Sequence, residues 1–140
     1  MKSTLILAAL AGVCVAVQTS LTGAAQRSLG PAVLVAVSGL TTGFCALLVS
    51  FFVARPEFTG RAVAYAGASG VLGAVIVGSV AVAAGQAGVA RALSLVIAAQ
   101  LIAGLVLDSF GIFGAGADFS IPRALGVVLI VAGGALVVSY

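Results

Sequence analysis

Long apolar runs separated by single charged residues are the feature that most constrains how this chain folds. Hydrophobic residues make up 63% of the sequence and charged residues 6%, whereas an average soluble domain has about 25% charged residues. A soluble fold of this size therefore lacks the charges to cover its surface. A transmembrane helix needs about 20 apolar residues, and a transmembrane β-barrel instead alternates apolar and polar ones. The continuous runs predict a membrane-embedded helical bundle.

We expect an all-α, polytopic transmembrane bundle that forms a single domain over residues 1–140. Charges, glycines and prolines place five spans at about residues 3–25, 32–54, 62–84, 92–107 and 123–140. The Gly30-Pro31 pair is expected to separate the first two spans, and a loop from Asp108 to Arg123 the last two. We interpret residues 1–25 as a retained helix and not as a signal peptide, because their apolar character continues to Ala25.

The basic residues indicate topology better than they indicate a ligand. With five spans, they divide between the two sides as Lys2, Arg55, Arg61 and Arg123 against Arg27 and Arg91. This weak bias favours a cytoplasmic N-terminus and also suits a chain that inserts in both orientations. The basic residues form no cluster or stripe, so we expect no nucleic-acid partner.

Small residues recur at helical spacing within the predicted spans. Gly39 and Gly43 form a GxxxG pair, and a second stripe with a spacing of four comprises Ala66, Gly70, Ala74 and Gly78. A third site is the Gly133-Gly134 pair. Because apolar burial does not drive helices together in lipid, such stripes predict close helix contacts, within one chain or between two. We interpret Cys14 and Cys45, which lie mid-span, as small packing residues.

Polar side chains within the spans are the candidate substrate-binding residues. Gln18 and Thr22 are four residues apart and share a helical face, while Gln100 lies near the middle of the fourth span and Asp108 at its end. Such residues usually face a protein interior or a water-filled cavity. In the alternative interpretation, each Gln bonds a neighbouring helix, and Asp108 caps the loop or pairs with Arg123. No ionisable residue lies near mid-span, which favours a neutral or weakly charged solute or uncoupled movement.

Nothing in the sequence indicates an enzyme. The chain has no His, no nucleophile–base pair and no glycine loop in a strand–turn–helix context. We therefore expect no catalytic residues, no metal site and no cofactor.

Several runs together resemble the YdcZ-type family of half-sized proteins in the drug/metabolite transporter (EamA-like) superfamily. The matching runs are AVQTSLTGAAQRSLGPA, VSGLTTGFCALL, AGASGVLGAVIV, AAQLIAGLVLDSFGIFG and PRALGVVLIVAGGALV. The similarity covers nearly the whole chain, with Thr22 standing where the family pattern has Asn. The resemblance implies five helices per chain, a multi-pass protein of a bacterial-type inner membrane and transport of a small solute.

Full-length members of that superfamily resemble two such units of opposite topology, and inverted repeats place a binding site near the membrane midplane. A single unit would then need a partner, either a second inverted copy or a homologous half. Two hypotheses follow. The first is a transporter in which Gln18, Thr22 and Gln100 line a shared cavity and Asp108 lies near one mouth. The second is a non-transporting scaffold or accessory subunit whose polar residues only join helices.

Overall fold

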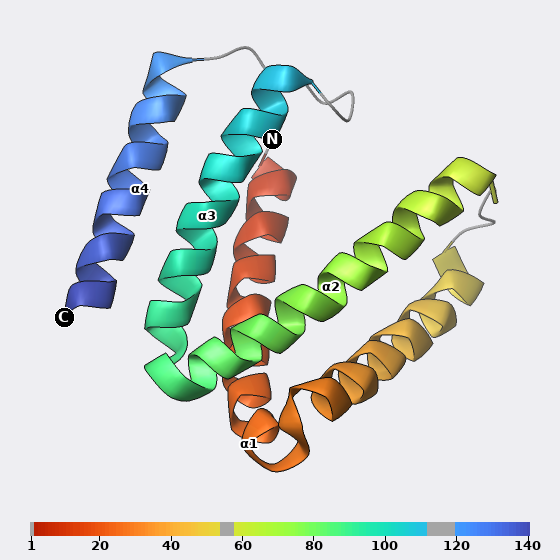
Figure 1. The fold of residues 1–140 in the computed structure, drawn as a ribbon. Helices are drawn as coiled ribbons and strands as arrows, with labels where there is room; N and C mark the ends of the chain where they lie inside the picture. The colour runs from red at the N-terminus through yellow and green to blue at the C-terminus, as the bar shows by residue number, and fades with distance from the viewer. Residues whose placement is uncertain (1, 54–57, 112–119) are drawn as a thin grey trace. The chain divides into compact units, whose positions relative to one another are not determined.

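The computed structural model describes residues 2–53, 58–111 and 120–140, which are almost entirely helical (Figure 1). The helices are α1 (Lys2–Val53), α2 (Gly60–Ala87), α3 (Val89–Phe110) and α4 (Ile121–Ser139). Each is long and apolar enough to cross a membrane. The prediction of a helical membrane protein therefore agrees with these elements.

The prediction of five separate spans is wrong, because the described part of the chain contains four helices. The first two expected spans, 3–25 and 32–54, both belong to α1. A straight helix of 52 residues would be about 78 Å long, more than twice the roughly 30 Å of a bilayer core. Helix α1 is not straight: it folds back on itself at Gly30 (Figure 1).

Helix α1 can reverse its direction within a single residue because that residue is Gly30. Its backbone angles, φ 73° and ψ 160°, lie in a region that is almost closed to side chains with a Cβ atom. Pro31 follows directly, and proline is well tolerated at the start of a helix because no backbone donor is needed there. The sequence located the break correctly but predicted a gap between two helices. We call residues 2–29 and 31–53 the first and second arms of α1.

Helices α2, α3 and α4 are mostly longer than the spans predicted for them. The expected spans 62–84, 92–107 and 123–140 correspond to α2, α3 and α4, and α3 continues to Phe110. Half of the expected loop from Asp108 to Arg123 falls on residues 112–119, which lie outside the described residues, as does Arg55. Helix α4 follows Ser120, whose backbone is extended and whose side chain makes no capping hydrogen bond.

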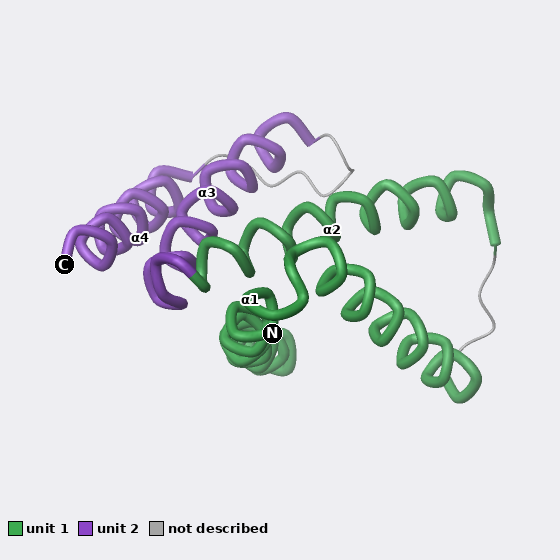
Figure 2. The backbone as a smooth tube through the Cα atoms, turned by 60° about the horizontal axis from the view of Figure 1, so that its bottom comes forward, with its two compact units in different colours: residues 1–85 green, residues 86–140 purple. Residues whose placement is uncertain are grey.

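The chain divides into two compact units, residues 1–85 and 86–140 (Figure 2). Unit 1 contains α1 and nearly all of α2. Unit 2 contains α3 packed against α4 in antiparallel orientation. We describe each unit separately.

In unit 1, the first arm of α1 and the end of α2 cross at backbone contact. A Cβ atom on Gly23 would lie 3.3 Å from the Ala84 Cβ atom and 3.4 Å from the Gly85 nitrogen. Close to this crossing, the Arg27 guanidinium donates a hydrogen bond of 3.0 Å to the Gly85 carbonyl oxygen. The bond satisfies one of the carbonyls left without a partner at the end of α2 and places a cation at the negative end of its dipole. We call this contact the Gly23 crossing.

In unit 2, a glycine lets α4 approach α3 closely. A Cβ atom on Gly134 would lie 3.4 Å from the backbone oxygen of Ser94. This confirms the predicted close contact at one member of the Gly133-Gly134 pair. At the other member, nothing lies within 4 Å of the position that a Cβ atom would take.

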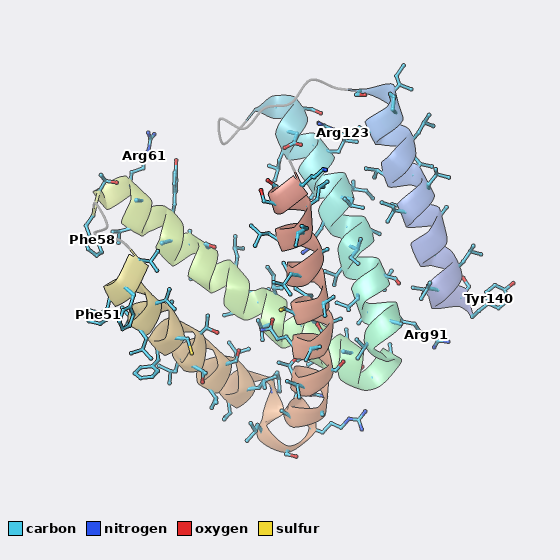
Figure 3. All side chains as sticks on the ribbon, turned by 180° about the vertical axis from the view of Figure 1, so that it is seen from behind. Phe51, Phe58, Arg61, Arg91, Arg123 and Tyr140 are labelled. Atoms are coloured by element: carbon cyan, nitrogen blue, oxygen red, sulfur yellow. The ribbon has the colours of Figure 1, made fainter. Side chains whose placement is uncertain are left out.

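Most large apolar side chains point outward from all four helices (Figure 3). Among the described residues, the buried apolar side chains are those of Leu34, Ala81, Ala84 and Ala92. An apolar surface of this extent is unusual in soluble monomers. It suits helices whose outer faces contact lipid or another chain.

Candidate functional site

Two open grooves lie along α1 in unit 1, and both contain polar side chains. The first, which we call the α1 groove, lies between the two arms and has a volume of about 510 Å³. The first arm contributes Gln18 and Thr22 to its lining, and the second arm contributes Ser38, Thr41 and Thr42. The rest of the lining is mainly apolar, so the groove is a hydrocarbon-like surface with polar groups at a few positions.

The second groove, which we call the α1–α2 groove, lies between the second arm of α1 and α2 and has a volume of about 790 Å³. It shares Gln18, Ser38 and Thr42 with the α1 groove. Glycines form much of its remaining wall: Gly39, Gly43, Gly70 and Gly73. The three shared polar residues therefore stand where the two grooves meet.

Two of the predicted site residues, Gln18 and Thr22, lie together at the α1 groove. The Gln18 side chain is exposed and makes no hydrogen bond within the described residues. Thr22 is partly buried, and its hydroxyl donates a 3.2 Å hydrogen bond to the Thr19 carbonyl. The Gln18 amide thus offers two donors and one acceptor to whatever enters the groove.

Sequence reasoning missed the three polar residues of the second arm. The Thr41 hydroxyl donates to the Val37 carbonyl and the Thr42 hydroxyl to the Ser38 carbonyl, each at 2.9 Å. These bonds occupy the hydroxyl donors but leave the oxygens able to accept. The available signal was the spacing of Ser38 and Thr42, four residues apart in VSGLTTG, which places both on one helical face.

The predicted glycine stripes line open space instead of a helix contact. Nothing lies within 4 Å of a Cβ atom built on Gly39, Gly43 or Gly70. Of the stripe residues, Gly78 does approach α1, because its Cβ position lies 3.4 Å from the Val35 Cγ2 atom. Within unit 1, these three glycines make no close helix contact among the described residues and instead thin the wall of the α1–α2 groove. Contact with a second chain, the other predicted alternative, stays a prediction.

The other two predicted site residues, Gln100 and Asp108, lie on α3 in unit 2. Gln100 is exposed and makes no hydrogen bond in the described part of the chain. The Asp108 carboxylate lies 3.8 Å from the Arg123 guanidinium, and both side chains are 45% exposed. The pairing with Arg123 that the alternative interpretation predicted is therefore present. The structure therefore brings Gln18 and Thr22 together in unit 1, whereas Gln100 and Asp108 share only helix α3 in unit 2.

The dipoles of α3 and α4 explain why Asp108 and Arg123 pair. Asp108 lies in the last turn of α3, where the helix dipole disfavours a negative charge, and Arg123 lies in the first turn of α4, where it disfavours a positive one. Pairing offsets both unfavourable terms. Gly111 then ends α3 in a left-handed conformation, φ 59°, with its N–H donating to the Asp108 carbonyl at 3.2 Å.

Among the described residues, no charged side chain lines either groove. Their polar groups can donate and accept hydrogen bonds but cannot neutralise a charged ligand. This chemistry suits recognition of uncharged groups in an apolar setting.

Comparison of the chain with curated proteins and with solved structures finds no match. The model of one protein family, described as "Putative inner membrane exporter, YdcZ", matches residues 3–136. The resemblance read from the sequence motifs is thereby confirmed. With nearly its whole length matched, the chain belongs to this YdcZ family.

Proposed function

We propose that this chain is one half of a small-solute exporter that assembles from two chains, most simply two copies inserted in opposite orientations. Family membership supports export across an inner membrane. The observation that carries the two-chain arrangement is the exposed Gln18 amide in an open groove. An amide within a membrane span is costly without a partner, and a second chain would enclose the groove that contains it.

The distribution of basic residues also supports insertion in both orientations. In unit 1, Arg27 lies at the end where α1 reverses and Arg61 at the opposite end (Figure 3 labels Arg61). In unit 2, Arg91 and Arg123 lie at opposite ends (Figure 3). Because orientation follows the Lys and Arg bias between the two sides, a weak bias is expected to allow both.

In the proposed assembly, Gln18, Thr22 and Gln100 line a cavity shared by the two chains, and Asp108 lies near one mouth. The solute would meet amide and hydroxyl groups in the cavity. The two arms of α1 and the helices α2, α3 and α4 contain no Asp, Glu, Lys or Arg near their middle among the described residues, and such a group is what proton-coupled cation transport usually requires. A neutral or weakly charged solute is therefore favoured.

Orientation in living cells tests the assembly. A variant without Cys14 and Cys45 would carry a single cysteine in place of Tyr140, which is 95% exposed at the C-terminus. A membrane-impermeant maleimide is added to intact cells and to inverted vesicles. Comparable labelling from both sides is expected for two inverted copies. Labelling from one side alone would contradict the inverted homodimer and direct the search to a homologous second chain.

Transport itself is tested with Gln100→Leu, with its assembly checked by cross-linking. Loss of export with an unchanged oligomer is expected if the Gln100 amide faces the solute. If the variant exports normally, the role of Gln100 is refuted. If it exports nothing because the oligomer falls apart, Gln100 joins helices, as in a scaffold or accessory subunit.

A further inference from the structure

We infer that the α1–α2 groove binds a neutral, mainly apolar organic solute, with Gln18, Ser38 and Thr42 as its hydrogen-bonding residues and glycines setting its size. This inference rests on the proposed function and adds the substrate class and a site in each chain. Ser38 and Thr42 have no assigned role in the exporter proposed above.

The size of the groove suits a small organic molecule. Its volume of about 790 Å³ lies within the roughly 300–1,000 Å³ typical of small-molecule sites. Such sites are mostly apolar and contain a few polar groups that fix the orientation of the ligand. The α1–α2 groove has this composition: its lining is mainly apolar and glycine residues, with the three polar side chains that it shares with the α1 groove.

The polar groups select against charge. Gln18 supplies two N–H donors and a carbonyl acceptor, and the Thr42 oxygen can accept while its proton is held by the Ser38 carbonyl. In the part of the chain that the structure describes, no carboxylate, ammonium or guanidinium lines the groove. A charged solute would lose its hydration there without gaining a counter-ion, which is unfavourable in an apolar setting. A solute with a hydroxyl or carbonyl group would gain hydrogen bonds instead.

The glycines give a means of filling the groove without disturbing the chain itself. Side chains added at Gly43 or Gly70 would project into open space, because nothing lies within 4 Å of either Cβ position. Gly12 has the same open surroundings on the first arm of α1 but does not line either groove. Gly12→Leu is therefore a matched control for Gly43→Leu and Gly70→Leu.

The test uses three photoreactive benzophenones that differ in charge. They are neutral 4-(hydroxymethyl)benzophenone, anionic 4-benzoylbenzoate and cationic (4-benzoylbenzyl)trimethylammonium. The full-length protein in lipid nanodiscs is irradiated with each probe over a range of concentrations, and the adducts are located by peptide mass spectrometry. We expect saturable labelling of the groove by the neutral probe, and about tenfold or more weaker labelling by both charged probes.

The variants then locate the site. Gly43→Leu and Gly70→Leu should each lower groove labelling by the neutral probe about tenfold, since a filled groove excludes the ligand, while Gly12→Leu should leave it unchanged. A further neutral probe, 4-methylbenzophenone, lacks the hydroxyl group. Gln18→Leu should reduce the preference for the hydroxymethyl probe over 4-methylbenzophenone about two- to tenfold, the range expected for one lost hydrogen bond.

Three results would overturn the inference. The first is unsaturable labelling spread over lipid-facing positions such as Leu5 and Leu10, which indicates partitioning into lipid alone. The second is equal labelling by neutral and charged probes. The third is a loss of labelling in Gly70→Leu together with a change of oligomeric state by native mass spectrometry, because the groove would then hold a helix of a second copy. These measurements of binding depend neither on transport nor on the orientation of the chain in the membrane. If the protein binds the neutral probe but exports nothing, the exporter assignment fails and the inferred binding site stands.

Discussion

Replacing Gly23 by Leu should weaken the Gly23 crossing strongly, whereas replacing Gly12 by Leu should not. At Gly23 the first added carbon would already lie 3.3 Å from the Ala84 Cβ atom, and the rest of the side chain would push α1 away from α2. At Gly12 nothing lies within 4 Å. Both changes give a similar gain in helix propensity, so the difference between them isolates the steric cost. Overpacking costs about 1–3 kcal/mol, or about 5- to 150-fold in the folding equilibrium.

The assay is unfolding of the purified protein in mixed micelles by added dodecyl sulfate, followed by far-UV circular dichroism, because the chain has no Trp for fluorescence. Gly23→Leu is expected to be less stable than Gly12→Leu by the amount above. Gly23→Ala serves as the graded intermediate, because one methyl group at 3.3 Å requires a shift of only a few tenths of an ångström. Equal stability of the two leucine variants would refute the close crossing of α1 and α2.

Three further predictions concern single contacts. Arg27→Gln should lower the free energy of unfolding by up to about 1.5 kcal/mol, because it removes an exposed charge-assisted hydrogen bond to the Gly85 carbonyl. The same unfolding assay measures this change, and an unchanged unfolding midpoint would contradict the hydrogen bond. Gly30→Ala should cost about 1–3 kcal/mol, because φ 73° and ψ 160° strain any side chain with a Cβ atom; a stabilised variant would refute the reversal at this residue. A double-mutant cycle with Asp108→Asn and Arg123→Gln should give a coupling free energy of about 0.2–1 kcal/mol in the unfolding assay. This coupling should fall with added salt, because both side chains are 45% exposed. A coupling that does not change with salt would contradict the exposed pair.

The sequence was sufficient for the helical membrane class and for the position of each break, because long apolar runs and glycine or proline punctuation act locally. It was insufficient for the number of helices. Whether Gly30-Pro31 ends a helix with a loop or reverses it in one residue depends on the backbone angles of Gly30, and a glycine permits both outcomes. The count of five spans failed at this single residue.

Glycine patterns predicted helix contact with mixed success for a related reason. Gly134 does contact α3, and Gly23, which lies in no predicted stripe, makes a close contact with α2. Gly39, Gly43 and Gly70 line a groove instead. A small residue permits close approach of another helix but does not require it, so the choice depends on the angle at which helices cross. That angle is a property of the whole unit and is not encoded in the spacing.

Of the four candidate polar residues, the two glutamines differ from the others because their side chains find no partner within the described residues. A Ser or Thr in a helix donates to a carbonyl three or four residues earlier, as Ser20 does to Ala16 at 2.9 Å and Thr41 does to Val37. Such residues are tolerated in lipid, and their presence alone says little about function. A Gln side chain is too long to make this local bond, and neither Gln18 nor Gln100 makes any hydrogen bond among the described residues.

This difference supports the proposal that the chain is completed by something outside itself. In a bilayer core, water does not supply the missing partner, and an unsatisfied amide costs several kcal/mol. Gln18 and Gln100 each need a partner from a second chain, a water-filled cavity or a bound solute. A second copy that encloses the α1–α2 groove can supply all three, because it excludes lipid from the amide and leaves room beside the glycines for solute and water. The glutamines therefore favour an assembled pathway over a bundle in which every polar group is locally paired.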